Sequence, residues 1–180
     1  MKGVIFTEFL EMVETTLSPE IADRLLDECD LPSGGVYTAV GTYDHQEIVA
    51  MITKLSEITG ICPPDLIKAF GNYLFPRFRT LYPGFFEGIE SALDFLSQIE
   101  SVIHLQVLKL YPDAELPKFE IRRPNTQTLV MTYYSDRHMG DLAEGLIEAC
   151  IKHFGTPLNL MRENLNDPGQ PVRFTIREPQ

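Results

Sequence analysis

The sequence has few of the residues that build covalent frameworks or metal cages. Its 180 residues contain three cysteines, four histidines and no tryptophan. Cys29, Cys62 and Cys150 lie far apart and show no CxxC spacing, so neither a disulfide framework nor a zinc knot is predicted. We expect these cysteines to be small buried thiols in a reducing compartment.

The chain also lacks an excess of positive charge and any long apolar run. Its formal net charge of −11 argues against binding to nucleic acid or to an acidic membrane surface. No apolar run reaches the roughly 18 residues that suggest a membrane span. Glu8 and Glu11 interrupt the apolar N-terminal stretch, so no signal peptide is expected. We therefore predict a cytoplasmic protein without a membrane or nucleic-acid partner.

The residues that are present fit one globular domain. The chain is 44% hydrophobic and 23% charged, which is enough to form a sizeable core. Residues 1–180 are predicted to form a single domain. Within it, a helical N-terminal subdomain covers about 1–60 and a C-terminal subdomain covers about 61–180.

Capping and breaking residues mark the predicted helices. Ser18-Pro19 is typical of a helix start, and Asp44 and Gly60 are placed to begin and end another helix. Pro76 lies inside an apolar helical pattern and should kink or divide that helix. A longer helix is predicted from about Ser91 to about Lys109, with apolar residues at helical spacing.

After Pro117 the apolar residues alternate instead of following a helical period. A first hairpin is predicted across Pro124-Asn125-Thr126 and a second across Asn166-Asp167-Pro168-Gly169, with a helix at 138–154 between them. This order predicts an α+β fold with a four-stranded, mainly antiparallel sheet. The side chains expected to pair in the first hairpin are Phe119 and Ile121 with Leu129, Met131 and Tyr133.

His104 is the histidine whose surroundings are unusual. It lies between Ile103 and Leu105, in a helix that otherwise reads as core. A buried neutral imidazole needs a partner for each ring nitrogen, and its free nitrogen is a good metal ligand. The alternative is a core histidine that is hydrogen-bonded to backbone or to a hydroxyl. Glu100, four residues earlier, is placed either to orient the ring or to face solvent.

A cage made of protein ligands alone is hard to assemble from so few histidines and cysteines. One histidine suffices when the cofactor supplies the other four ligands, as heme does. Heme also carries two propionates. Tyr133, Ser135 and Arg137 would share one face of an extended strand, and together they offer donors suited to carboxylates. The alternative is an edge strand that carries a single cation.

Taken together, these stretches resemble the heme nitric oxide/oxygen-binding (H-NOX) family over essentially the full chain. By that resemblance, the fold is a helical N-terminal lobe with helices packed on the sheet, enclosing heme b. His104 would be the axial iron ligand, and Tyr133, Ser135 and Arg137 would hold the propionates. The stretches that carry the resemblance are Met1-Lys2-Gly3 with Ile5, Ala69-Phe70-Gly71, Val102-Ile103-His104, Leu110-Tyr111-Pro112, Leu116-Pro117, the YxSxR motif from Tyr133 to Arg137, and Leu142 to Ile147.

The resemblance also assigns the remaining pocket residues and the gas. Ile5 and Pro117 would press on the porphyrin, and Phe78 and Leu146 would line the distal side. The oxygen-binding branch carries a distal tyrosine where this chain has Leu142. The positions that assist this tyrosine resemble Phe9 and Leu74, neither of which can donate a hydrogen bond. The expected function is a sensor that binds NO and CO but not O2.

In the family picture, NO breaks the histidine–iron bond and the N-terminal lobe shifts. The sequence carries no kinase, cyclase or phosphatase motif, so the expected protein is a stand-alone bacterial sensor and not an enzyme. Its expected partner is a separate histidine kinase or cyclic-di-GMP enzyme.

Some relatives carry a C-terminal zinc site, but this chain has no cysteine after Cys150 and no histidine after His153. Ordinary polar residues are expected at Met161–Asn166, with no zinc. Two alternatives to the sensor are a heme-free ligand-binding adaptor and a heme peroxidase or oxygenase. The second lacks a distal acid–base group.

Overall fold

The computed structural model describes residues 1–166 and 171–179, and these form two compact units that meet inside one helix. The division falls between Phe70 and Gly71, about ten residues later than the predicted boundary near residue 60. The first unit contains α1 (Gly3–Thr16), α2 (Pro19–Glu28), α3 (His45–Thr59) and the beginning of α4 (Pro63–Leu81).

Local capping explains where the helices of the first unit begin and end. Ser18 Oγ accepts a hydrogen bond from the backbone N–H of Ile21, and Asp44 Oδ1 accepts one from Gln46 at 3.0 Å. Gly60 ends α3 with a φ of 74°, a left-handed conformation that glycine adopts without strain. These three predicted helix boundaries are confirmed.

The long loop between α2 and α3 holds the start of α1. The backbone N–H of Gly3 donates to Gly41 O at 2.8 Å, and that of Val4 donates to Ala39 O at 3.0 Å. Both N–H groups belong to the first turn of a helix, where no partner exists within the helix itself. Glu47 of α3 is buried and accepts a hydrogen bond from the Tyr37 hydroxyl at 2.7 Å, which fixes the loop on α3.

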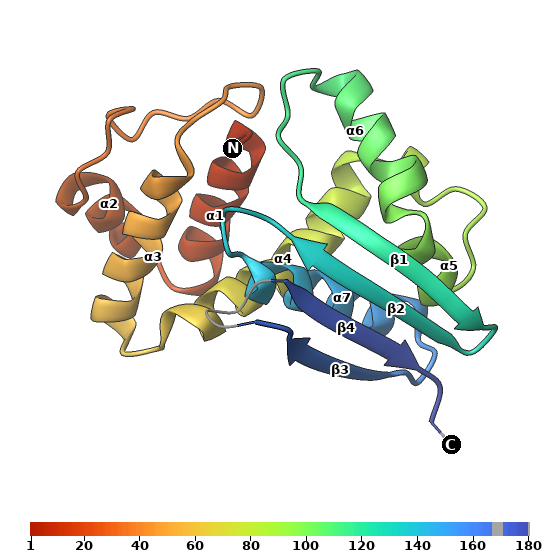
Figure 1. Ribbon diagram of the computed structural model, residues 1–180. Helices are drawn as coiled ribbons and strands as arrows, with labels where there is room; N and C mark the ends of the chain where they lie inside the picture. The colour runs from red at the N-terminus through yellow and green to blue at the C-terminus, as the bar shows by residue number, and fades with distance from the viewer. Residues whose placement is uncertain (167–170, 180) are drawn as a thin grey trace. The chain divides into compact units, whose positions relative to one another are not determined.

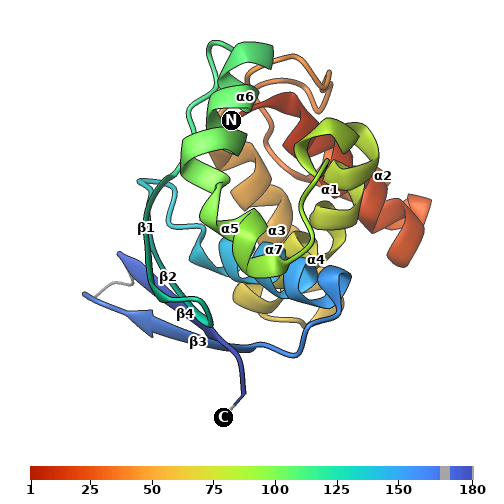
Figure 2. The same cartoon turned by 90° about the vertical axis from the view of Figure 1, so that its right-hand side faces the viewer.

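The second unit consists of a sheet with helices on one of its faces. In Figures 1 and 2, α5 and α7 lie against one face of the sheet, and the other face is uncovered. All neighbouring strands are antiparallel, in the order β1-β2-β4-β3, as predicted. The elements after α4 are η1 (Pro83–Phe85), α5 (Ala92–Ser97), the π-helical turn η2 (Ile99–Ile103), α6 (His104–Leu110), β1 (Lys118–Asn125), β2 (Thr128–Tyr134), α7 (Gly140–Phe154), β3 (Asn159–Asn164) and β4 (Val172–Arg177).

The strand registers confirm the first predicted hairpin, although its turn lies at Thr126 and Gln127 and not at Pro124-Asn125-Thr126, because β1 continues to Asn125. Phe119 lies opposite Tyr133, and Ile121 lies opposite Met131. The second hairpin joins β3 to β4. Its predicted turn, Asn166-Asp167-Pro168-Gly169, lies mostly outside the described residues, of which it includes only Asn166.

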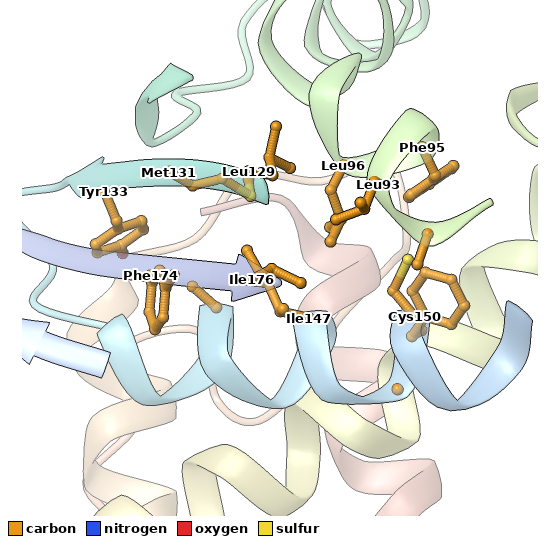
Figure 3. Close-up of a cluster of buried hydrophobic side chains, with 14 of the residues drawn as sticks. Leu93, Phe95, Leu96, Leu129, Met131, Tyr133, Ile147, Cys150, Phe174 and Ile176 are labelled. Carbon is orange, nitrogen blue, oxygen red and sulfur yellow. The ribbon is translucent and has the colours of Figure 1, made fainter. Parts of the chain in front are cut away.

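The core of the second unit lies between the sheet and its two covering helices. Figure 3 shows side chains of β2 and β4 meeting those of α5 and α7. Leu129, Phe174 and Ile176 are 0% exposed, and Cys150 of α7 is fully buried with them. Burial raises the pKa of the Cys150 thiol far above its usual range, so this thiol is unreactive.

The predicted long helix at 91–109 is wrong as a continuous α-helix. α5 ends at Ser97, and the carbonyl of Gln98 accepts the N–H groups of both Val102 and Ile103, at 2.9 and 3.0 Å. The N–H of His104 then bonds to Ile99 O, five residues earlier. A wide turn of this kind keeps apolar residues on nearly the same stripe, so apolar periodicity could not reveal it.

Two further expectations concern helices. Of the two effects expected of Pro76, a kink or a division of its helix, the division does not occur, since α4 runs from Pro63 to Leu81 with the proline inside it. α6 has no buried residue, although its sequence reads as core, and Leu105 and Leu110 are more than half exposed.

Gly71 of α4 packs directly on the backbone of α7. A Cβ at position 71 would lie 2.4 Å from Leu142 O, 2.9 Å from Leu146 N and 3.0 Å from the Cα of Gly145. These are backbone atoms, so no rotation of a side chain could make room. A residue larger than glycine at position 71 would therefore push the two helices apart.

We expect Gly71→Ala to destabilise the protein by about 1–3 kcal/mol, the usual cost of overpacking. In an exposed helix the same change would stabilise the protein by about 1 kcal/mol. The backbone clash therefore decides the sign of the change in stability. Urea-induced unfolding measures the effect. Gly84→Ala is the matched control, because nothing lies within 4 Å of its added Cβ. A Gly71→Ala protein as stable as the unmodified chain would contradict this packing.

Candidate functional site

His104 lies at the junction of the π-helical turn and α6, and a carboxylate holds its ring. Its side chain is 15% exposed, and Nδ1 donates a hydrogen bond to Glu100 Oε2 at 3.1 Å. The same carboxylate oxygen accepts the backbone N–H of Phe119 at 3.0 Å. Glu100 therefore ties His104 to the first residues of β1, which agrees with the role in orienting the ring that we considered from the sequence.

This hydrogen bond decides which ring nitrogen is free. Because a carboxylate only accepts, Nδ1 carries the proton and Nε2 keeps its lone pair. Nε2 takes part in no hydrogen bond within residues 1–166 and 171–179. Histidines that bind metals use the same arrangement, in which the second nitrogen donates to a carboxylate or carbonyl. The alternative of a core histidine that is satisfied at both nitrogens does not describe this ring.

Electrostatics also favour the neutral, ligating form of His104. Burial lowers the pKa of His104 below that of a free histidine, and the charge and hydrogen bond of Glu100 only partly oppose this effect. A lowered pKa means that the ring is uncharged near neutral pH. The ring is thus in the neutral form, the form in which an imidazole is able to act as a metal ligand.

The other three histidines are less buried than His104. His45 is the half-buried first residue of α3, and His138 and His153 are exposed. Arg79 contacts the ring of His153 at 2.9 Å. In the described part of the chain, no group of three or more His, Cys, Asp or Glu residues could hold a metal ion by itself.

An aromatic contact connects His104 to the predicted propionate-binding residues. The ring of Phe119 lies 5.9 Å from that of His104 and 5.4 Å from that of Tyr133, between ring centroids. Phe119 and Tyr133 are paired across β1 and β2. The histidine and the first residue of the YxSxR motif therefore line the same region.

The YxSxR motif does not lie on one extended strand, so the predicted reason for its shared face is wrong. β2 ends at Tyr134, and a turn follows in which Ser135 Oγ accepts the backbone N–H of Arg137 at 3.2 Å. β2 is an inner strand of the sheet, which also rules out the edge-strand alternative. The hydrogen bond to Ser135, and not strand alternation, keeps Ser135 and Arg137 together.

Arg137 already binds a carboxylate in this structure. Its guanidinium donates to Glu115 Oε2 at 2.6 Å and to the Glu115 backbone carbonyl at 2.7 Å. The Arg137 side chain is 15% exposed, whereas that of Glu115 is 82% exposed. A mostly buried guanidinium that faces an exposed, replaceable carboxylate is suited to accept another carboxylate in its place.

Tyr133 contributes a neutral hydroxyl to the same group. The side chain is 4% exposed, and this burial raises the pKa of Tyr133 above its usual value, although hydrogen bonds with Ser135 and with the backbone of Met139 act in the opposite direction. The hydroxyl therefore keeps its proton at neutral pH and is able to donate it in a hydrogen bond.

The apolar candidates of the second unit lie on three elements. Leu142 and Leu146 are half-buried residues of α7, and Leu74 and Phe78 of α4 follow Gly71 at helical spacing. Because Gly71 contacts the backbone at Leu142 and Leu146, the structure brings these two helices together at the predicted distal side. Pro117 is half-buried in the loop before β1.

Two further candidates belong to the first unit. Ile5 and Phe9 are on α1, where Ile5 is half-buried and Phe9 is fully buried against Phe70, with ring centroids 5.3 Å apart. Their predicted contact with a cofactor stays a prediction.

Sequence reasoning does not find the contacts of three residues around the site. It places Phe119 only in the first hairpin, does not single out Glu115, and predicts an ordinary polar residue at Arg162. Arg162 instead binds Asp141 and Glu144 of α7. The alternation of β3 could have placed Arg162 on the inner face, but the sequence does not show which acidic residues it meets there.

The site fits the class of domains that hold a macrocyclic metal cofactor through a single protein ligand. One ring nitrogen of His104 is available, Phe119 connects this ring to Tyr133, and Arg137 of the same motif binds a carboxylate. Within the described residues, no helix is both long enough and apolar enough to cross a membrane.

Comparison with known proteins identifies the family. The sequence profile described as Haem-NO-binding matches residues 2–162. The chain therefore belongs to the H-NOX family of heme-binding gas-sensor domains, which are sensors rather than enzymes. The comparison with curated proteins finds no match.

Solved structures of H-NOX proteins are similar to this chain over almost all of their length. The unliganded Fe(II) protein from K. algicida is 34% identical, with a TM-score of 0.93 over 100% of this chain and 97% of that chain. The IWP-051-bound Fe(II)CO protein from Shewanella woodyi is 37% identical, with a TM-score of 0.85 over 99% and 95%. The Fe(II)NO protein from S. oneidensis is 24% identical over 100% of both chains and supports the fold alone, with a TM-score of 0.91.

The role of Glu100 can be tested through the pKa of His104. We expect Glu100→Gln to lower this pKa further, because the variant loses the negative charge that favours the imidazolium but keeps an amide oxygen for the N–H of Phe119. A pH titration of the histidine ring signals by NMR in the heme-free protein measures the shift. Glu120→Gln on β1 is the control. An unchanged or raised pKa of His104 in Glu100→Gln would contradict this electrostatic role.

Proposed function

We propose that this chain binds heme b through His104 and senses nitric oxide. The observation that carries the proposal is the state of His104, whose Nδ1 is bound to Glu100 while Nε2 keeps a free lone pair. When bound, ferrous heme supplies an iron atom that can take a diatomic gas as a further ligand. The Haem-NO-binding description of the family supports NO as a gas ligand, and the Fe(II)CO state of the S. woodyi protein supports CO.

Tyr133, Ser135 and Arg137 hold the heme propionates in this proposal. The Arg137 guanidinium exchanges the exposed carboxylate of Glu115 for a propionate, and the neutral Tyr133 hydroxyl donates a second hydrogen bond. Charge-assisted bonds to arginine are among the stronger hydrogen bonds in proteins. Pro117 and Ile5 press on the porphyrin.

The side chains proposed for the gas-binding side explain a preference for NO and CO over O2. Leu142 and Leu146 of α7, with Leu74 and Phe78 of α4, carry no hydrogen-bond donor. Bound O2 carries partial negative charge and gains from a donor, whereas NO needs little such help. Phe9 of α1 is equally unable to donate. The same lack of an acid–base group disfavours a peroxidase or oxygenase.

The proposed output depends on His104 and the helix that carries it. His104 would hold the iron in the resting state, and its release on NO binding would shift the N-terminal lobe through α6, Pro117 and Ile5. The protein then regulates a separate histidine kinase or cyclic-di-GMP enzyme in the cytoplasm. Its net charge of −11 suits a partner with a basic surface. We propose no zinc site and no activity as an enzyme.

An absorption spectrum of the purified protein tests the central proposal. We expect a Soret band in the ferrous protein that shifts when NO or CO is added and does not shift in air. A protein without a Soret band after heme is supplied would instead support a heme-free ligand-binding adaptor. Peroxide turnover by the ferric protein would support an enzyme.

The role of His104 is tested by His104→Gly. We expect this variant to lose heme during purification and to recover it when imidazole is supplied, because imidazole replaces the missing ligand. Heme content, measured from the Soret absorbance relative to the protein concentration, reports the effect. His138→Gly is a suitable control, because His138 is exposed and has a φ of 53° that glycine accepts. Full heme retention by His104→Gly without imidazole would refute the assignment.

The preference against O2 is tested by Leu142→Tyr. We expect this variant to form an oxygen complex in air, because the added hydroxyl donates a hydrogen bond to bound O2. Leu142→Phe has almost the same size without the hydroxyl and should remain unable to bind O2. The spectra of both variants are compared in air and under argon. If neither variant, or both, bound O2, hydrogen bonding at position 142 would not control the selectivity.

A further inference from the structure

Arg162 is an inward-pointing charge on an edge strand of the sheet. β3 pairs only with β4 within the described residues, and Arg162 lies opposite Phe174, which is fully buried in the core. Its side chain is 26% exposed. An inward charge is one way to keep an edge strand from pairing with other chains, but that role alone would need no particular partner on α7.

Arg162 binds two carboxylates at the beginning of α7. Its Nη1 donates to Asp141 Oδ1 and, at 2.7 Å, to Glu144 Oε2. The side chains of Asp141 and Glu144 are only 20% and 15% exposed. Two like charges three residues apart on a helix repel each other, and here both are largely withdrawn from water. Arg162 supplies the positive charge that lets them lie side by side.

The two carboxylates lie on either side of Leu142 in the sequence. Gly140, the first residue of α7, has little room for a side chain, since a Cβ there would lie 3.0 Å from Val172 Cγ2 and 3.4 Å from Arg162 Nη2. From the other direction, Gly71 of α4 contacts the backbone at Leu142 and Leu146. The first two turns of α7 are therefore held between α4 and the β3–β4 hairpin, with Arg162 as the charged contact.

We propose that Arg162 is a positioning residue for gas binding. By fixing the first turn of α7, it sets the position of Leu142 and Leu146, and through them the rates at which gases enter and leave. This inference rests on the proposed function, in which these leucines line the gas-binding side. Arg162 itself does not touch the gas or the cofactor.

The test compares Arg162→Met with the unmodified holo-protein. We expect the dissociation rate of CO to change by about two- to thirty-fold, the range for couplings carried through packed elements, and the C–O stretching band to broaden or shift. Arg162→Lys keeps a positive charge and should recover most of the original band. Arg173→Met is the control, because Arg173 also forms an ion pair, with Glu163 at 3.1 Å, but this pair is more exposed and Arg173 alternates to the outer face of the sheet.

Glu144→Gln provides a milder second variant in case Arg162→Met does not fold. It weakens one of the two ion pairs and should alter the C–O band in the same direction by a smaller amount. CO rates and C–O bands that are unchanged in both variants, or changed equally in Arg173→Met, would overturn the proposal. The absence of a Soret band in the unmodified protein would instead overturn the proposed function.

Discussion

The hydrogen bond between Glu100 and His104 is the interaction on which the rest of the site depends. One carboxylate oxygen accepts both the Nδ1–H of His104 and the backbone N–H of Phe119. It thereby fixes the tautomer of the ring and also the distance between α6 and β1. A partly buried carboxylate with two donors has a strong preference for this geometry. Without it, the free Nε2 would have no fixed direction.

The π-helical turn η2 connects α5 to the helix that carries His104. The N–H groups of Ile103 and His104 reach five residues back instead of four. This change in the turn allows the helical segment to continue beyond a buried α5 into an exposed α6. π-Turns are rare and occur frequently at functional sites. The π-helical turn next to His104 agrees with this tendency, because the irregular helical geometry sets the position of one functional side chain.

Much of this arrangement was predictable from the sequence, and the exceptions have a common cause. Ser18, Asp44 and Gly60 begin or end helices through contacts with nearby backbone, and the alternation from Phe119 onward reflects burial of one face of a strand. Both features can be recognised in a single sequence. The turn at Gln98, the end of β2 at Tyr134 and the partners of Arg137 and Arg162 depend on which groups meet in space. Residue spacing does not predict such contacts between distant residues. Only the resemblance to a family, and not periodicity, therefore relates His104 to Arg137.

The loop between α6 and β1 connects the two halves of the site. It follows the helix that carries His104, includes Glu115 and Pro117, and leads directly to Phe119, whose backbone is bound to Glu100. Arg137 holds this same loop through Glu115. A carboxylate that replaced that of Glu115 would remove one of the two hydrogen bonds by which Arg137 holds this loop, and the bond to the Glu115 backbone carbonyl would remain. The loop is therefore a direct structural link between His104 and Arg137 within the second unit.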